Sequence, residues 1–136
     1  MRVVLDTNII VSAVFWGGVA RQAFEIAQGN HILCFTEDTL AELDRILRYP
    51  KFAERLNRLD FTITEFIERL TERALILPAP VHPVDIIKDD PDDNKFLACG
   101  RDARATIIVS GDKHLLTLKT FEDIKIITAP EFIWHF

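Results

Sequence analysis

The chain has 136 residues, of which 49% are hydrophobic, 27% charged and 10% aromatic. This is the size and composition of a single globular domain over residues 1–136, and 5 Gly and 6 Pro exclude collagen-like and low-complexity chains. Lys and Arg total 16 against 21 Asp and Glu, so the formal net charge of −5 disfavours a broad, non-specific nucleic-acid binder.

Cysteine usage and the N-terminal residues indicate a cytoplasmic protein. Cys34 and Cys99 lie in apolar surroundings without a CxxC spacing, which favours reduced interior thiols over a disulfide. The first apolar residues meet Asp6 too early to form a signal peptide. The longest apolar stretch, residues 9–16, is too short to span a bilayer, so we expect no membrane segment.

Apolar segments typical of strands alternate with segments typical of helices. The expected strands are residues 3–5, 31–35, 74–77, 105–110 and 124–127. The expected helices are residues 20–28, a helix capped by Thr36 that ends near Tyr49, residues 62–73, a helix beginning near Pro91, residues 113–118 and a short helix after Pro130. Apolar strands alternating with helices predict an α/β domain with a parallel sheet covered on both faces.

Acidic residues follow the expected strands where a parallel sheet of this kind forms its sites. Asp6 comes directly after the first strand, and Asp112 follows the fourth through Ser110 and Gly111. Residues 90–94, with the sequence DPDDN, begin the helix before that strand. Carboxylates gathered at one edge repel one another unless cations neutralise them, and all-oxygen ligands suit Mg²⁺ or Mn²⁺. The pattern therefore favours metal-assisted attack on a phosphodiester or phosphoryl group.

Each of these acids also has an ordinary structural interpretation, which the residues alone leave open. Asp6 could begin a turn, and Asp112 could cap the following helix. The acids of residues 90–93 are common at helix starts. Glu42 lies on a helix, where a helical wheel places it away from the leucine face and towards solvent.

Four segments, taken in chain order, resemble the four acidic motifs of the PIN-domain nucleases. They are Val3–Ile9, Thr39–Leu43, Asp90–Ala98 and Ile107–Leu116. The chain looks most like the PIN toxins of bacterial and archaeal toxin–antitoxin pairs, of the VapC kind. The resemblance implies a three-layer α/β/α sandwich with a mainly parallel sheet and a strand order resembling 3-2-1-4-5.

The resemblance also implies which residues form the site. The acidic set around Mg²⁺ or Mn²⁺ would be Asp6, Glu42, Asp93 and Asp112. Asn8 and Ser110 would play supporting polar roles near the metal and the attacking water. Asp90 and Asp92 are left as caps or outer groups. Gly100 departs from the helix-favouring residue expected there, which would loosen its helix.

The implied activity is endonucleolytic hydrolysis of RNA, leaving a 3′-hydroxyl and a 5′-phosphate. Lys95 and Lys113 stand beside two of the acidic motifs and are candidates for phosphate contact, and Arg21 could widen the binding groove. The implied partners are an RNA substrate, a cognate antitoxin protein and a second copy of the chain in a homodimer.

Four alternatives remain at this point. A phosphatase of the haloacid-dehalogenase kind normally has a second Asp two residues after the first, where this chain has Asn8. A receiver-like domain also gathers acids at strand ends, but its acids would not be spread over these elements. The others are a PIN-like RNA-processing nuclease outside a toxin system and a non-catalytic PIN module that only binds a partner.

Overall fold

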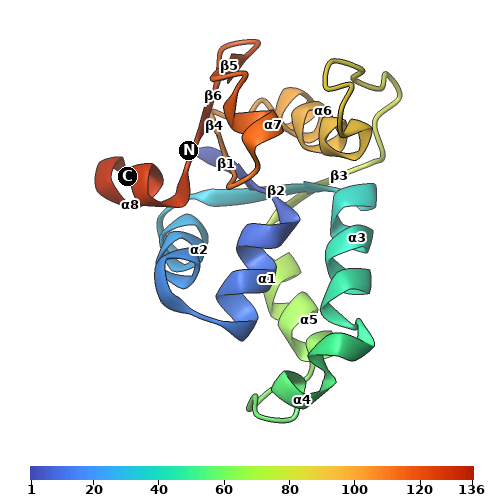
Figure 1. The fold of residues 1–136 in the computed structure, drawn as a ribbon, viewed down its shortest axis with the longest axis vertical. Helices are drawn as coiled ribbons and strands as arrows, with labels where there is room; N and C mark the ends of the chain where they lie inside the picture. Colours follow the sequence, from blue (N-terminus) through green and yellow to red (C-terminus); the bar gives the residue numbers. More distant parts are fainter.

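A computed structural model describes residues 1–136. It contains one six-stranded sheet with the order β3-β2-β1-β4-β6-β5, flanked by helices (Figure 1). The strands are β1 (Arg2–Leu5), β2 (Ile32–Thr36), β3 (Leu75–Leu77), β4 (Ile107–Val109), β5 (Thr120–Phe121) and β6 (Ile124–Ile127). The α-helices are α1 (Thr7–Phe15), α2 (Gly18–Asn30), α3 (Glu37–Leu47), α4 (Ala53–Leu56), α5 (Ile63–Arg73), α6 (Asn94–Ala103), α7 (Lys113–Leu116) and α8 (Ala129–His135). The short 3₁₀ turns are η1 (Pro50–Phe52) and η2 (Pro91–Asp93).

The helices form a layer on each side of the sheet, so the expected three-layer α/β/α architecture is confirmed. Helices α1, α2, α3 and α5 cover one face, and α6 and α7 cover the other (Figure 1). Helix α6 packs across β1, β2, β3 and β4, and α8 packs against α2. No single helix is long and apolar enough to cross a bilayer; α1 and α2 meet those criteria only as a pair bent by 112°.

The strand order agrees with the expected order in its five main positions and adds one edge strand. Neighbouring strands from β3 to β6 are all parallel. The expected fifth strand is β6, beside β4, and β5 pairs antiparallel with it at the edge. Glu122 and Asp123 have φ values of 45° and 68°. The hairpin turn thus uses left-handed backbone at two non-glycine residues, so no glycine marked it in the sequence.

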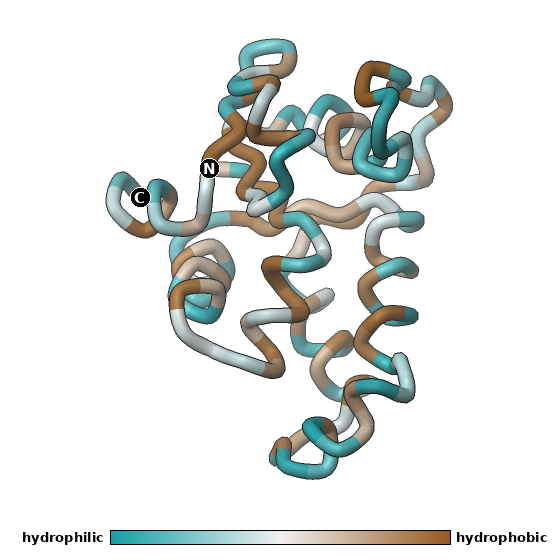
Figure 2. Tube along the Cα trace, in the orientation of Figure 1, coloured by the Kyte–Doolittle hydropathy of each residue, from teal (hydrophilic) through white to brown (hydrophobic).

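Side chains of the central strands alternate between two hydrophobic cores. Val3 and Leu5 of β1 belong to the core under α1, α2 and α3, whereas Val4 belongs to the core under α6. The chain trace accordingly shows hydrophobic colour along the buried strands and hydrophilic colour in the outer turns (Figure 2). Burial on both faces explains why the central strands read as continuous apolar runs.

Cys34 and Cys99 are both free and buried.

Helix α1 lies where the sequence showed only an apolar stretch, and it was not among the expected helices. Most of its residues are buried, and it packs between α2 and α3. A helix covered on several sides has little polar face, so the 3.6-residue pattern is weak. The available signal was Asp6, a favoured N-cap residue directly before it.

Gly100 does not loosen its helix, contrary to the expectation from the resemblance. It lies inside α6, which runs without a break from Asn94 to Ala103. A Cβ atom at this position would lie 3.1 Å from the Cδ1 atoms of both Ile108 and Ile124. Glycine therefore allows α6 to pack closely on β4 and β6.

Candidate metal centre

Asp6 is both a helix cap and a member of the acidic site. It follows β1, is 4% exposed, and its Oδ1 accepts a hydrogen bond of 3.0 Å from the backbone N–H of Ile9 in α1. Its Oδ2 accepts a hydrogen bond from the Ser110 hydroxyl. The two interpretations of Asp6 are therefore compatible, because the cap fixes the side chain at the sheet edge.

Asp112 combines the same two roles at the next strand. Leu5 of β1 pairs in parallel register with Val109 of β4, so the residues that follow these strands lie at the same edge. Asp112 caps α7, and its Oδ1 accepts a hydrogen bond of 2.8 Å from the backbone N–H of His114. Its own N–H donates to the Ser110 oxygen over 2.9 Å.

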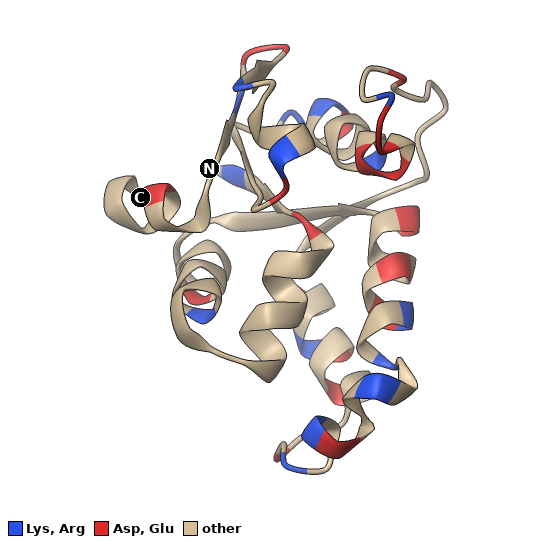
Figure 3. Ribbon diagram, in the orientation of Figure 1, with Lys and Arg blue, Asp and Glu red and all other residues tan.

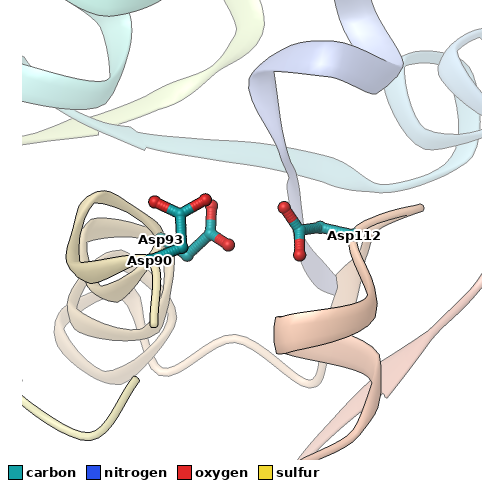
Figure 4. A group of neighbouring side chains, drawn as sticks. All are labelled: Asp90, Asp93 and Asp112. Carbon is teal, nitrogen blue, oxygen red and sulfur yellow. The ribbon is translucent and has the colours of Figure 1, made fainter. Parts of the chain in front are cut away.

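Asp90 and Asp93 approach Asp112 from the turn that precedes α6. One carboxylate oxygen from each of the three residues lies within 4.8 Å of the others, and Figure 4 shows Asp90 and Asp93 facing Asp112 across a gap. The Asp90 side chain caps no helix. The sequence predicts a cap or outer group at Asp90, whereas the structure places it inside the cluster.

Glu42 is buried, which corrects the helical-wheel expectation of a solvated side chain. It is 8% exposed. Its Oε2 accepts a hydrogen bond of 2.8 Å from Thr7 Oγ1, and its Oε1 lies 3.1 Å from Lys95 Nζ. The wheel described α3 alone, but α1 and α6 supply the groups that surround Glu42.

One cleft of about 210 Å³ brings the four acids of the motifs together. Its lining residues are Asp6, Thr7, Asn8, Glu42, Ile46, Asp90, Asp92, Asp93, Phe96 and Asp112. Asn8 is exposed at this cleft, and Ser110 is fully buried beside Asp6. Figure 3 shows acidic segments at the end of β1, before α7 and at the turn before α6.

The cluster around Asp93 carries more negative charge than its surroundings neutralise. Burial, followed by hydrogen bonding and repulsion from Asp112 and by repulsion from Asp90, raises the pKa of Asp93 to about 7. Burial likewise raises the pKa of Asp6 above its usual range, against the hydrogen bond from Ser110. The Oδ2 atom of Asp93 is buried without a hydrogen-bond partner.

Lys95 neutralises a different part of the same cleft. Its Nζ lies 3.1 Å from Glu42 Oε1 and 2.8 Å from Asp92 Oδ1. Burial works to lower the pKa of Lys95, but hydrogen bonds to Asp92 and Glu42 outweigh burial and raise it. The hydrogen bond from Lys95 in turn holds the pKa of Asp92 below its usual range.

The other basic candidates lie in different places. Lys113 is exposed, directly follows Asp112 and forms no ion pair. Arg21 donates from Nε to the Ala13 carbonyl over 3.1 Å and from Nη2 to the Val14 carbonyl over 3.4 Å. These carbonyls belong to the end of α1 opposite Asp6, so the structure does not bring Arg21 to the acidic cleft.

Two residues of this site were not singled out from the sequence. Thr7 holds Glu42, and its only signal was its position between Asp6 and Asn8. Asn94 fixes the loop that carries Asp90: its side-chain oxygen accepts from Ile86 N–H and Ile87 N–H, and its amide nitrogen donates to the carbonyls of Ile87 and Pro91. Asparagine is common at helix starts, so the sequence alone does not indicate that Asn94 holds this loop.

The residues present fit a hard divalent cation. The cluster offers only carboxylate oxygens as ligands. Such a set suits Mg²⁺ and Mn²⁺ better than it suits softer metal ions. The unpartnered, buried Asp93 Oδ2 is an acceptor that a cation would satisfy. Asp90, Asp93 and Asp112 would hold the cation, with Asp6 beside them.

Comparison with known proteins identifies the family. A family model described as the PIN domain matches residues 2–114, so the chain belongs to the PIN-domain family. None of the curated proteins matches the sequence. Among solved structures, this chain is similar to a chain in the crystal structure of VapBC2 from Rickettsia felis bound to a DNA fragment from their promoter. The identity is 15% with a TM-score of 0.60, over 94% of this chain and 98% of that chain, which supports the fold.

Proposed function

We propose that this protein is a metal-dependent endoribonuclease and the toxin of a toxin–antitoxin pair. The observation that carries the proposal is the cleft itself. The acids of all four PIN-like motifs line it, and a buried carboxylate oxygen in it has no partner. A purely structural set of caps would not leave that oxygen unsatisfied.

In this proposal the carboxylates have different roles in the site. Asp6, Asp93 and Asp112, joined by Asp90, hold Mg²⁺ or Mn²⁺, and Glu42 completes the acidic set from α3. A bound divalent cation supplies Lewis-acid stabilisation of phosphate charge and helps to activate water. Ser110 keeps the Asp6 carboxylate oriented through its hydrogen bond.

Other polar groups at the cleft would position RNA and water. Asn8 offers an exposed amide at the cleft, and Lys113 offers an exposed ammonium beside Asp112. Attack of water on phosphorus with rupture of the P–O3′ bond leaves a 3′-hydroxyl and a 5′-phosphate. Because the net charge is −5, RNA would be held locally by the cation and by such side chains, not by a broad basic surface.

The biological role rests on the family and on the structural likeness. The similar solved structure is named VapBC2 and is bound to promoter DNA. A cognate antitoxin is therefore the partner we propose, with a homodimer of the chain in the cytoplasm. Expression of the chain should arrest growth, and co-expression of a small neighbouring reading frame should relieve the arrest. Cleavage without growth arrest would point to an RNA-processing nuclease outside a toxin system.

The biochemical test uses purified protein with labelled single-stranded RNA and a DNA strand of the same sequence. We expect RNA fragments bearing 5′-phosphates in Mg²⁺ or Mn²⁺, and none in EDTA. Undiminished cleavage in EDTA would contradict the metal assignment, and intact RNA in every condition would favour a non-catalytic PIN module. Asp93→Asn should abolish the fragments, and Asp89→Asn is its matched control, because Asp89 is exposed in the loop before η2 but lies outside the cleft.

A further inference from the structure

The six carboxylates of the cleft divide into two groups that differ in how their charge is balanced. Glu42 and Asp92 each form an ion pair with Lys95. The other four form no ion pair: Asp6, Asp90, Asp93 and Asp112. The positive charge of Lys95 therefore neutralises carboxylates on one side of the cleft. The side that holds the Asp93 cluster has no positive side chain.

On the Glu42 side of the cleft, both carboxylate oxygens of Glu42 also have a hydrogen-bond donor. Glu42 Oε1 faces Lys95 Nζ at 3.1 Å, and Oε2 accepts from Thr7 Oγ1 at 2.8 Å. The Lys95 side chain is 18% exposed, so it reaches the pair from within the fold and not from bulk water. By contrast, Asp93 Oδ2 is buried with no donor.

From this division we infer that Lys95 occupies the place of a second cation, so that the cleft binds one divalent ion, among the four unpaired acids Asp6, Asp90, Asp93 and Asp112. The inference rests on the proposed metal-dependent function and specifies how many divalent ions each chain binds. Lys95 is then a positioning residue: it holds Glu42 and Asp92 in place and supplies the positive charge that a second ion would otherwise bring. It is not free to contact RNA phosphate, which was its expected role.

Removal of the Lys95 charge should create a second metal-binding site at Glu42 and Asp92. Without it, buried Glu42 and nearby Asp92 form an uncompensated pair, a condition that is costly for buried carboxylates unless a cation binds. The Asp92 side chain is 67% exposed and can move to coordinate an ion. A carboxylate pair with water in the remaining positions is an ordinary Mg²⁺ or Mn²⁺ arrangement.

The test counts Mn²⁺ ions bound per chain by the EPR signal of free Mn²⁺ during titration, supported by isothermal titration calorimetry. We expect one ion for the wild type and for Lys95→Arg, and two for Lys95→Met. The double variant Lys95→Met with Glu42→Gln should return to one, because the second site loses its buried ligand. Lys88→Met is the matched control, since Lys88 pairs only with exposed Asp85, and it should bind one ion.

The outcomes separate this inference from the proposed function. Two ions in the wild type, or one ion in folded Lys95→Met, would overturn the role of Lys95 and leave the metal centre standing. No Mn²⁺ binding to the wild type would overturn the metal centre and the inference together. If Lys95→Met does not fold by circular dichroism, the wild-type and Lys95→Arg counts decide, and two ions in either overturn the inference.

Discussion

Ser110 donates a hydrogen bond to Asp6 and at the same time accepts one from the backbone N–H of Asp112. One fully buried hydroxyl, 104 residues from Asp6 in the chain, thus links the acids that follow β1 and β4. The parallel pairing of Leu5 with Val109 places both acids at this edge. The strand register and one side chain therefore set the spacing of this side of the cleft.

Loss of the Ser110 hydroxyl should weaken metal binding. Ser110→Ala leaves Asp6 Oδ2 without its donor, and outer hydrogen bonds to metal ligands are worth about 10–100-fold in affinity. We expect Mn²⁺ affinity to fall by about 10-fold in calorimetry, with recovery in Ser110→Thr. Ser12→Ala, a change within α1 and away from the cleft, should have no effect. Equal affinity in Ser110→Ala would contradict the positioning role.

The pKa of Asp93 predicts an unusual pH dependence of stability without metal. The folded-state pKa of about 7 lies above the ordinary value of 3.8, so the folded protein holds a proton that the unfolded chain releases. The contribution to stability is present below pH 4 and is lost as the pH rises through about 7. In EDTA, the melting temperature should therefore fall between pH 6 and pH 8, measured by circular dichroism.

Two further measurements check the origin of that effect. Asp93→Asn removes the charge, so in EDTA at pH 8 it should melt at a higher temperature than the wild type. Since a cation displaces the proton, Mn²⁺ should raise the wild-type melting temperature more at pH 8 than at pH 6. A wild-type melting temperature that Mn²⁺ changes equally at both pH values would contradict the coupling.

Much of the fold and the common sheet edge of Asp6 and Asp112 were predictable from the sequence. Strand burial on both faces gives apolar runs, and parallel strands bring Asp6 and Asp112 to one edge whatever the details of packing. The α/β class with a parallel sheet covered on both faces followed from those local patterns, whereas the strand order and the place of Glu42 and Asp93 in the acidic set followed only from the resemblance to the PIN-domain nucleases. The identity of the site residues as ligands is still a prediction that the experiments above test.

The burial of Glu42 and the orientation of Asp90 were not predictable in the same way. The surroundings of Glu42 come from Thr7 and Lys95, which lie 35 and 53 residues away. The orientation of Asp90 depends on a 3₁₀ turn at η2 and on the loop held by Asn94. These are tertiary contacts between side chains, and neither periodicity nor capping rules contain them.

Asn94 should be important for the fold of the loop before η2. Asn94→Ala removes its hydrogen bonds to Ile86, Ile87 and Pro91, leaving buried backbone groups unpaired. We expect a loss of about 2–4 kcal/mol in urea unfolding, with faster amide exchange at Ile86 and Ile87. Asn30→Ala, at the exposed end of α2, should change stability little. Normal protection of both amides in Asn94→Ala would refute this role.

Gly29 and Gly100, each within a helix, should respond differently to alanine. Gly29 lies in α2 with open space around its Cβ position, so Gly29→Ala should stabilise the protein by about 0.5–1 kcal/mol. Gly100→Ala crowds Ile108 and Ile124, and the cost of overpacking, about 1–3 kcal/mol, should cancel or exceed the same helix gain. Urea unfolding measures both. A stabilisation of Gly100→Ala equal to that of Gly29→Ala would show that α6 does not need the close approach.

The central claim is that the Asp93 cluster is the catalytic metal centre of a ribonuclease. Its most direct test is the single-turnover rate of RNA cleavage in Mn²⁺ for the wild type, Asp93→Asn and the loop control Asp89→Asn. We predict a loss of at least about 10²-fold in folded Asp93→Asn and a wild-type rate in Asp89→Asn. A folded Asp93→Asn protein that cleaves RNA at the wild-type rate would contradict the assignment of this metal centre.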